Sequence, residues 1–206
     1  MNIAFKKLLF IGPHPDDVEM GCGGIISRYS KNTQMTYLIL SPCLEDPKNK
    51  NILNEAREAI SLLGLSKESL IIENLPRRTF HDQRRNIREI LISVKEKFTP
   101  DIVFCPSIKD IHQDHSVTAE ETLRLFRDIG VISYEAPRSS LRFEPNLYIE
   151  LSDKNLKIKI DALLRYKSQY DKYYFEPSVI QSFARMRGSQ CKVKYAEAFE
   201  VLRIKI

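Results

Sequence analysis

The chain has 206 residues and a formal net charge of +5, with 43% apolar and 29% charged residues. This composition is that of an ordinary globular protein and argues against disorder. The lysines and arginines are scattered among acidic residues rather than gathered in a basic arm, so we expect no nucleic-acid partner.

The length predicts one domain over residues 1–206, since a chain of this size can bury a sizeable core. No apolar segment of signal-peptide length precedes the first strand, and no apolar run approaches membrane-spanning length. The four cysteines are far apart and form no C-x-x-C pair, which favours reduced, buried thiols. We therefore expect a cytoplasmic protein without membrane insertion, and a homo-oligomer is compatible with the sequence.

Short apolar runs alternate with helical patterns through the first part of the chain. Strands are expected at 8–11, 34–41, 69–73 and 101–106. Helices are expected at 18–29, 53–63, 81–98 and after residue 115, with a polar loop at 42–51. Such alternation predicts right-handed βαβ units, and therefore an α/β fold with a mainly parallel sheet and helices on both faces.

The pattern changes after Gly130, where strands at 131–135, 146–150 and 199–206 predict a C-terminal β-containing extension. Between them, residues 153–170 have helical periodicity, with Asp153 as the expected cap. Residues 170–175 and 185–189 are expected to be surface loops.

The first strand runs directly into Pro13-His14-Pro15-Asp16-Asp17. The prolines stiffen the turn that presents the histidine, which suits a metal ligand. The strand at 101–106 leads to a second cluster, His112-Gln113-Asp114-His115. Because ligands bind at the carboxyl ends of parallel strands, we expect the two clusters to converge, although the second alone would also fit an ordinary helix cap.

Catalytic zinc takes three protein ligands, often histidine and carboxylate, and keeps one position for water. His14, Asp17 and His115 meet that requirement, so we predict Zn²⁺ or another divalent metal there. His81, the remaining histidine, is interpreted as structural or at the surface.

Two further patterns give weaker signals. The glycines of Gly21-Cys22-Gly23-Gly24 fit a dinucleotide loop poorly and better suit close packing of the first helix. Arg77, Arg78, Arg138 and the Arg185–Arg187 pair could meet an anionic substrate group, but a solvated surface explains each of them as well.

With the two His/Asp motifs in these positions, the sequence resembles the PIG-L/LmbE family of zinc-dependent N-deacetylases. Three further segments support the resemblance over nearly the whole chain: Glu19 with Gly23-Gly24, Leu63-Gly64, and the C-terminal Tyr195-Ala196-Glu197-Ala198-Phe199. Two departures stand out. Ile52 to Glu55 replaces a substrate-contacting arginine, and Asp110 or its neighbours replace a tyrosine that many members carry before the second motif.

The resemblance implies a Rossmann-like fold and removal of the acetyl group from an N-acetylated amino sugar or its conjugate. It also implies roles for the matching residues. His14, Asp17 and His115 correspond to the metal ligands, Asp16 to the general base, and His112 with Asp114 to a histidine beside the metal and its orienting partner. Two other readings stay open from the sequence: a metal-free nucleotide-binding Rossmann module, and a metal-binding protein without catalytic activity.

Overall fold

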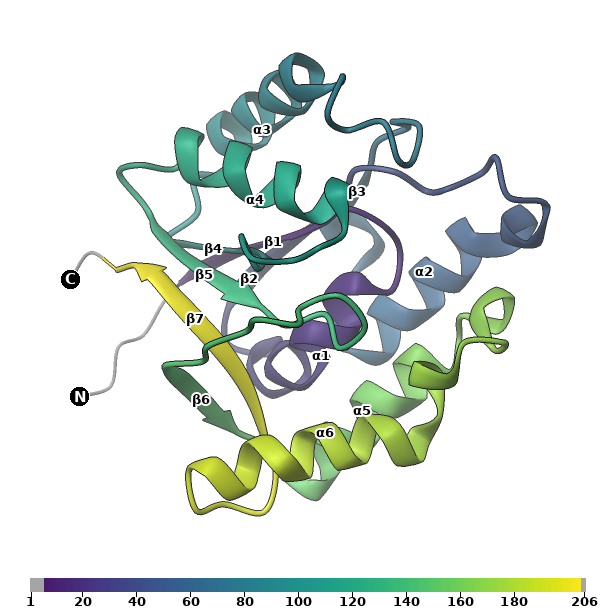
Figure 1. Ribbon diagram of the computed structural model, residues 1–206, viewed down its shortest axis with the longest axis vertical. Helices are drawn as coiled ribbons and strands as arrows, with labels where there is room; N and C mark the ends of the chain where they lie inside the picture. The colour runs from purple at the N-terminus through teal and green to yellow at the C-terminus, as the bar shows by residue number, and fades with distance from the viewer. Residues whose placement is uncertain (1–5, 205–206) are drawn as a thin grey trace.

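The computed structural model describes residues 6–204 and, within them, a single seven-stranded sheet in the order β3-β2-β1-β4-β5-β7-β6 (Figure 1). The strands are β1 (Lys7–Gly12), β2 (Gln34–Ile39), β3 (Leu70–Ile72), β4 (Ile102–Pro106), β5 (Gly130–Tyr134), β6 (Leu147–Glu150) and β7 (Ala196–Arg203). β1 to β5 are parallel, whereas β7 is antiparallel to both β5 and β6. The predicted α/β fold with a mainly parallel sheet and a C-terminal β-containing extension is confirmed, and the structure shows that this extension is antiparallel. The last two residues of the strand expected at 199–206 lie outside the described residues.

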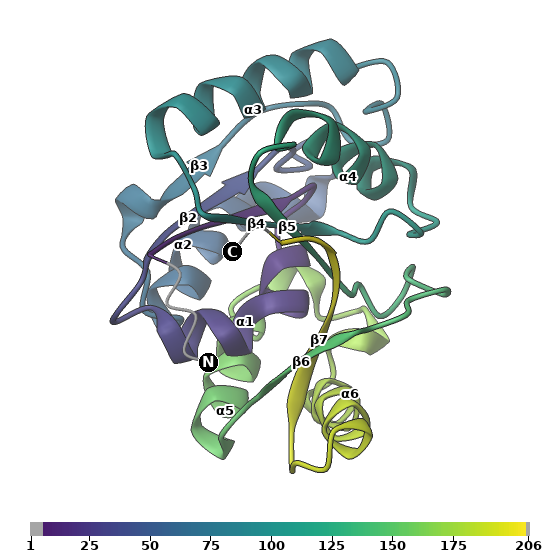
Figure 2. The ribbon, with the colours of Figure 1, turned by 90° about the vertical axis from the view of Figure 1, so that its left-hand side faces the viewer.

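Helices cover both faces of the sheet, as Figures 1 and 2 show. They are α1 (Asp17–Tyr29), α2 (Ile52–Leu62), α3 (Arg84–Phe98), α4 (Gln113–Leu125), α5 (Asp153–Leu163) and α6 (Pro177–Gln190). One core contains α3 and α4, and the other contains α1, α2, α5 and α6. Within residues 6–204, no helix combines the length and apolarity needed to cross a membrane.

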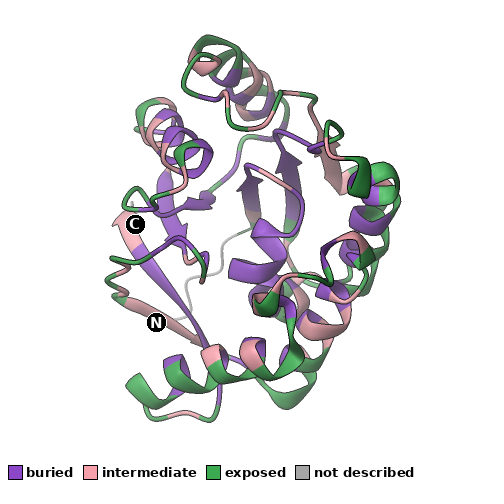
Figure 3. Ribbon diagram, turned by 45° about the vertical axis from the view of Figure 1, so that its right-hand side comes forward, coloured by how far each residue is buried: buried purple, intermediate pink, exposed green. Residues whose placement is uncertain are grey.

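The central strand β1 is buried because it contributes to both cores. Leu8 and Phe10 pack on the side of α1, whereas Leu9 and Ile11 pack on the side of α3 and α4. Side chains alternate between the faces of a strand, so a strand covered on both sides needs a continuous apolar run. Figure 3 shows the result: the central strands are buried, and exposed residues lie on the outer faces of the helices.

The main error of the sequence reading lies at residues 185–189, which were expected to be a surface loop but belong to α6. Pro177 occupies the first turn of this helix, where its missing N–H costs nothing. Few of its residues are buried, among them Ile180 and Ala184. The apolar stripe is therefore too narrow to reveal the helix by periodicity.

Three other segments also differ from the structure expected for them. Pro47–Asn51 and Tyr173–Phe175 form 3₁₀ turns, and α5 ends at Leu163 rather than near residue 170. The cap of α5 is Ser152, whose hydroxyl accepts a hydrogen bond from the N–H of Asn155 in a capping box, and not Asp153.

The glycines of α1 pack closely against other elements, as expected. A Cβ atom on Gly21 would lie 2.4 Å from the ring of Tyr134, and one on Gly24 would lie 2.4 Å from Leu151. Beside them, the carboxylate of Glu197 accepts hydrogen bonds from the N–H groups of Gly24 and Ile25, both 2.8 Å long. These glycines bring α1 against β5 and β7, so they do not form a phosphate loop.

Candidate metal centre and active-site cleft

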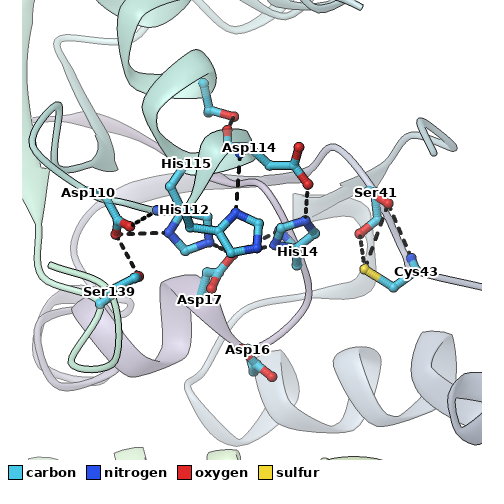
Figure 4. Close-up of polar contacts among 12 residues, drawn as sticks. His14, Asp16, Asp17, Ser41, Cys43, Asp110, His112, Asp114, His115 and Ser139 are labelled. Atoms are coloured by element: carbon cyan, nitrogen blue, oxygen red, sulfur yellow. Dashed lines mark hydrogen bonds and ion pairs between the residues drawn. The ribbon is translucent and has the colours of Figure 1, made fainter. Parts of the chain in front are cut away.

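Three histidines meet at the carboxyl ends of β1 and β4, so the two sequence motifs converge as expected (Figure 4). His14 follows β1, His112 is the N-cap of α4, and His115 lies in the first turn of that helix. The ring centroids are 5.1 Å apart for His14 and His112, and 4.5 Å apart for His112 and His115. One nitrogen of each ring lies within 4.8 Å of the others, so this group could hold a metal ion.

The carboxylate of Asp17 lies between two of these rings. Its Oδ2 is 3.4 Å from Nδ1 of His14 and 3.3 Å from Nε2 of His115. Tetrahedral zinc, with bonds of about 2.0–2.2 Å, separates its ligand atoms by about 3.3–3.5 Å. The distances from Asp17 Oδ2 to the two ring nitrogens therefore match those between ligands of one zinc ion.

Each of the two flanking histidines turns its other nitrogen toward a buried carboxylate. His14 Nε2 is 2.9 Å from Oδ2 of Asp114, and His115 Nδ1 is 3.0 Å from Oδ2 of Asp110. Histidines that ligate metals commonly donate their second N–H to a carboxylate, which fixes the tautomer and leaves the other nitrogen free for the metal. Both imidazoles are thus oriented for ligation.

His112 has a different partner. Its Nδ1 accepts a hydrogen bond of 3.2 Å from the main-chain N–H of Asp114. The carboxylate of Asp114 instead contacts His14 and accepts hydrogen bonds from the main-chain N–H groups of Arg78 and Phe80. Only the main chain of Asp114 contacts His112, whereas its side chain, expected to orient His112, contacts His14 instead.

The charges around the cluster favour a cation at its centre. Burial opposes ionisation of Asp17, but His115 and His14 bring the pKa of Asp17 well below its usual range. Burial also opposes a charged His115, yet Asp17 and Asp110 raise the pKa of His115 to about 10. By contrast, burial and the neighbouring histidines lower the pKa of His112 to about 4, so that ring is neutral at pH 7.

Asp16 stands apart from the histidines, with its carboxylate turned away from them in Figure 4. Its Oδ2 lies 3.4 Å from Nζ of Lys172, and its backbone has a left-handed φ of 81°. Burial raises the pKa of Asp16 to about 6, although Lys172 opposes the shift. A non-glycine residue in this conformation is strained, and such strain tends to be found at functional sites.

The histidines open into a cleft of about 560 Å³. Asp16, Asp17 and the three histidines form its floor, and its walls come from loops after β2, β3 and β5 and from residues 168–174. Sites for small ligands are commonly 300–1,000 Å³. The segment expected to be a surface loop at 170–175 therefore forms part of the cleft wall.

The sequence reading missed two residues of this site. Asp110 was noted only as a departure from the family pattern, and Lys172 was placed on a surface loop. Asp110 is five positions before His115, and its carboxylate also accepts hydrogen bonds from the hydroxyls of Ser139 and Ser140. The two serines lie 29 and 30 residues after Asp110, and no local sequence signal marks partners that far apart. His81, by contrast, is exposed, as expected.

The fold and the site together define an α/β protein with a candidate metal centre at the carboxyl ends of its parallel strands. A match to the family described as GlcNAc-PI de-N-acetylase (PIG-L) extends over residues 9–126, which include both His/Asp motifs. The chain belongs to this family of deacetylases.

Three proteins are similar to this chain. An uncharacterised deacetylase of Escherichia coli, YaiS, is 27% identical over 79% of this chain and 91% of its own length. The N,N'-diacetylchitobiose deacetylase of Pyrococcus horikoshii has a TM-score of 0.78 at 21% identity, covering 96% of this chain and 84% of that chain. Teicoplanin deacetylase Orf2, in a zinc-inhibited form, has a TM-score of 0.77 at 14% identity, covering 94% of this chain and 97% of that chain.

The two structural similarities, both under 25% identity, show the fold alone. The same fold occurs in a 4-carboxy-2-hydroxymuconate hydratase of Pseudomonas putida, with a TM-score of 0.70 at 17% identity, covering 98% of each chain. The fold alone therefore does not define the reaction, which depends on the residues in the cleft.

Proposed function

We propose that residues 1–206 act as one zinc-dependent N-deacetylase domain that removes the acetyl group from an N-acetylated amino sugar or its conjugate. The observation that carries this proposal is the position of Asp17 between His14 and His115, with a carboxylate behind each histidine. The names of the diacetylchitobiose and teicoplanin deacetylases support an amino-sugar substrate, and the cleft is large enough for one.

The hydrogen bonds favour His14, Asp17 and His115 as the zinc ligands, rather than the three histidines. Nδ1 of His112 accepts the N–H of Asp114, so the proton of this neutral ring lies on Nε2. A nitrogen that carries a proton offers a metal no lone pair, whereas at His115 the metal would replace the proton that Asp17 and Asp110 attract. His112 is thus a hydrogen-bond donor that faces the metal cluster.

When bound, zinc polarises the acetyl carbonyl and makes water reactive enough to attack an amide near neutral pH. The residues of the chain complete the reaction. Asp16, with a pKa near 6, accepts the proton of the attacking water as the new C–O bond forms. This requires its side chain to rotate from Lys172 toward the reacting atoms.

The Nε2–H of His112 donates to the oxygen that becomes negative in the tetrahedral intermediate, and a donor of this kind contributes about 10²–10³-fold in rate. The C–N bond then breaks, and Asp16 returns its proton to the leaving amine. The products are acetate and the amino sugar, whose amine takes up the proton that the acetic acid releases; Asp16 ends as a carboxylate, and His112 keeps its proton throughout.

The test is acetate release by the purified, zinc-loaded protein from a panel of N-acetylated amino sugars. His115→Ala and Asp17→Asn should lose zinc and activity, whereas His81→Ala, a change at the exposed histidine, should lose neither. His112→Ala should keep zinc and lose turnover. Equal loss of zinc in His112→Ala and His115→Ala would show the three-histidine ligand set instead, and failure to release acetate from any substrate would refute the deacetylase.

A further inference from the structure

The cleft is lined by five cationic side chains, and three of them are already paired. Lys172 contacts Asp16, Arg77 contacts Asp46, and Lys48 contacts Asp171. Arg78 and Arg138 also line the cleft and are exposed. Among the hydrogen bonds and ion pairs of residues 6–204, none engages the guanidinium group of either arginine.

The main chain at Arg78 is held in place although its side chain is free. Its N–H donates a hydrogen bond of 2.6 Å to Oδ2 of Asp114, the carboxylate behind His14, and its carbonyl accepts one of 3.0 Å from Gln113. The residue has a left-handed φ of 63°. A left-handed backbone is unfavourable for an arginine. The hydrogen bond to Asp114 stabilises this conformation and fixes the direction in which the side chain leaves the main chain.

Arg138 is fixed in a corresponding way on the other side of the cluster. The next two residues, Ser139 and Ser140, donate their hydroxyls to Oδ2 of Asp110, the carboxylate behind His115, at 2.9 and 3.0 Å. The carbonyl of Ser139 also accepts the N–H of Ile111. Each free arginine is thus anchored beside the carboxylate that orients one histidine.

We propose that Arg78 and Arg138 bind an anionic group, a phosphate or a carboxylate, on the part of the substrate that remains attached to the amino sugar. Arginine binds such groups through charge-assisted, often bidentate hydrogen bonds, and a preorganised backbone reduces the cost of ordering its side chain. Since the other three lysine and arginine side chains of the cleft contact carboxylates in this structure, these two guanidinium groups are the ones left to meet an anion. The inference rests on the proposed deacetylation and names the chemical class of its substrate.

The experiment compares kcat/KM for three substrates of the zinc-loaded protein: N-acetylglucosamine 1-phosphate, carboxymethyl N-acetylglucosaminide and the neutral methyl N-acetylglucosaminide. The wild-type protein should prefer at least one charged substrate over the neutral one by about tenfold or more, the effect of one charge-assisted hydrogen bond. Comparison of the first two substrates separates a phosphate from a carboxylate site.

Arg78→Gln and Arg138→Gln should each lower the charged-to-neutral ratio of kcat/KM by about tenfold. Neither substitution removes a main-chain contact: residue 78 still donates its N–H to Asp114, and Ser139, next to position 138, still accepts the N–H of Ile111. A change in this ratio therefore reports the guanidinium groups and not the fold. Arg165→Gln, at an exposed arginine outside the cleft, is the matched control and should leave the ratio unchanged.

Equal kcat/KM for charged and neutral substrates in the wild-type protein would overturn the inference, as would a ratio that survives the double substitution. Neither result would touch the proposed deacetylation, because acetate would still be released. Release of acetate from none of the three substrates would instead refute the deacetylase proposal.

Discussion

Replacing Asp110 by asparagine should weaken zinc binding without touching any zinc ligand. The carboxylate of Asp110 accepts four hydrogen bonds: from Nδ1 of His115, from two serine hydroxyls, and from the main-chain N–H of His112. An amide carries no charge and places an NH₂ group among these donors. In the variant, His115 loses the partner that fixes its tautomer and raises its basicity.

The expected size of the effect follows from this role. Loss of a carboxylate behind a metal-bound histidine commonly costs about 10–100-fold in metal affinity, or about 1.4–2.7 kcal/mol. Competition with a chromophoric chelator at pH 7 would measure the zinc Kd of wild-type and Asp110→Asn proteins. Asp114→Asn should show a loss of the same order, because Asp114 supports His14 in the same way.

Two controls separate this effect from general destabilisation. Asp82→Asn changes an exposed carboxylate and should leave the zinc Kd unchanged. Ser139→Ala removes one donor to Asp110 but keeps its charge and its bond to His115, so it should cost less than Asp110→Asn. A zinc Kd within twofold of wild type in Asp110→Asn, with the folded state intact by circular dichroism, would refute the reasoning.

Four other outcomes are expected. Asp16→Asn should keep zinc and lower kcat by about 10²-fold or more, measured by acetate release; wild-type turnover would exclude Asp16 as the base. Glu19 is fully buried against two tyrosine hydroxyls, and burial raises its pKa to about 7. Between pH 4.5 and 7 the folded chain keeps a proton that the unfolded chain releases, so the free energy of unfolding should fall by about 3 kcal/mol as pH rises. Urea denaturation of chelator-treated protein should show a steeper fall in the wild type than in Glu19→Gln, which keeps only the smaller fall due to the raised pKa of Asp16; parallel curves would contradict the assignment. Gly21→Ala forces a methyl group against Tyr134 and should lower stability by about 1–3 kcal/mol, seen as a lower Tm. Chelation of bound zinc should also lower Tm, and added zinc should restore it, since a ligand of the folded state stabilises that state.

The sequence was informative where a site depends on residues close to a strand end. Leu8 to Ile11 had the apolar run of a strand buried on both faces, and the following histidine and aspartates were adjacent in the chain. The second motif followed β4 in the same way. Parallel strands place their carboxyl ends on one edge, so the meeting of the two motifs followed from topology.

The residues that the sequence could not assign are held by contacts between distant segments. Asp110 is identified by its bonds to His115 and to a loop about 30 residues later, and Lys172 by its position 156 residues after Asp16. The side chain of Asp114 contacts His14, 100 residues away, rather than its near neighbour His112. Helix spacing gives no information about such pairs, because they depend on how loops pack over the sheet.

The same contacts separate the residues that hold the centre from those that can face a substrate. Asp114 contacts the main chain of Arg78, and Asp110 contacts the serines beside Arg138 rather than Arg138 itself. A different side chain at position 78 or 138 therefore leaves the partners of both histidines in place. If Arg78 and Arg138 bind the substrate as proposed, the recognised group can change while the histidine and aspartate cluster stays intact. In the proposed enzyme, the two motifs thus specify the chemistry of the site and the loops above it specify the substrate.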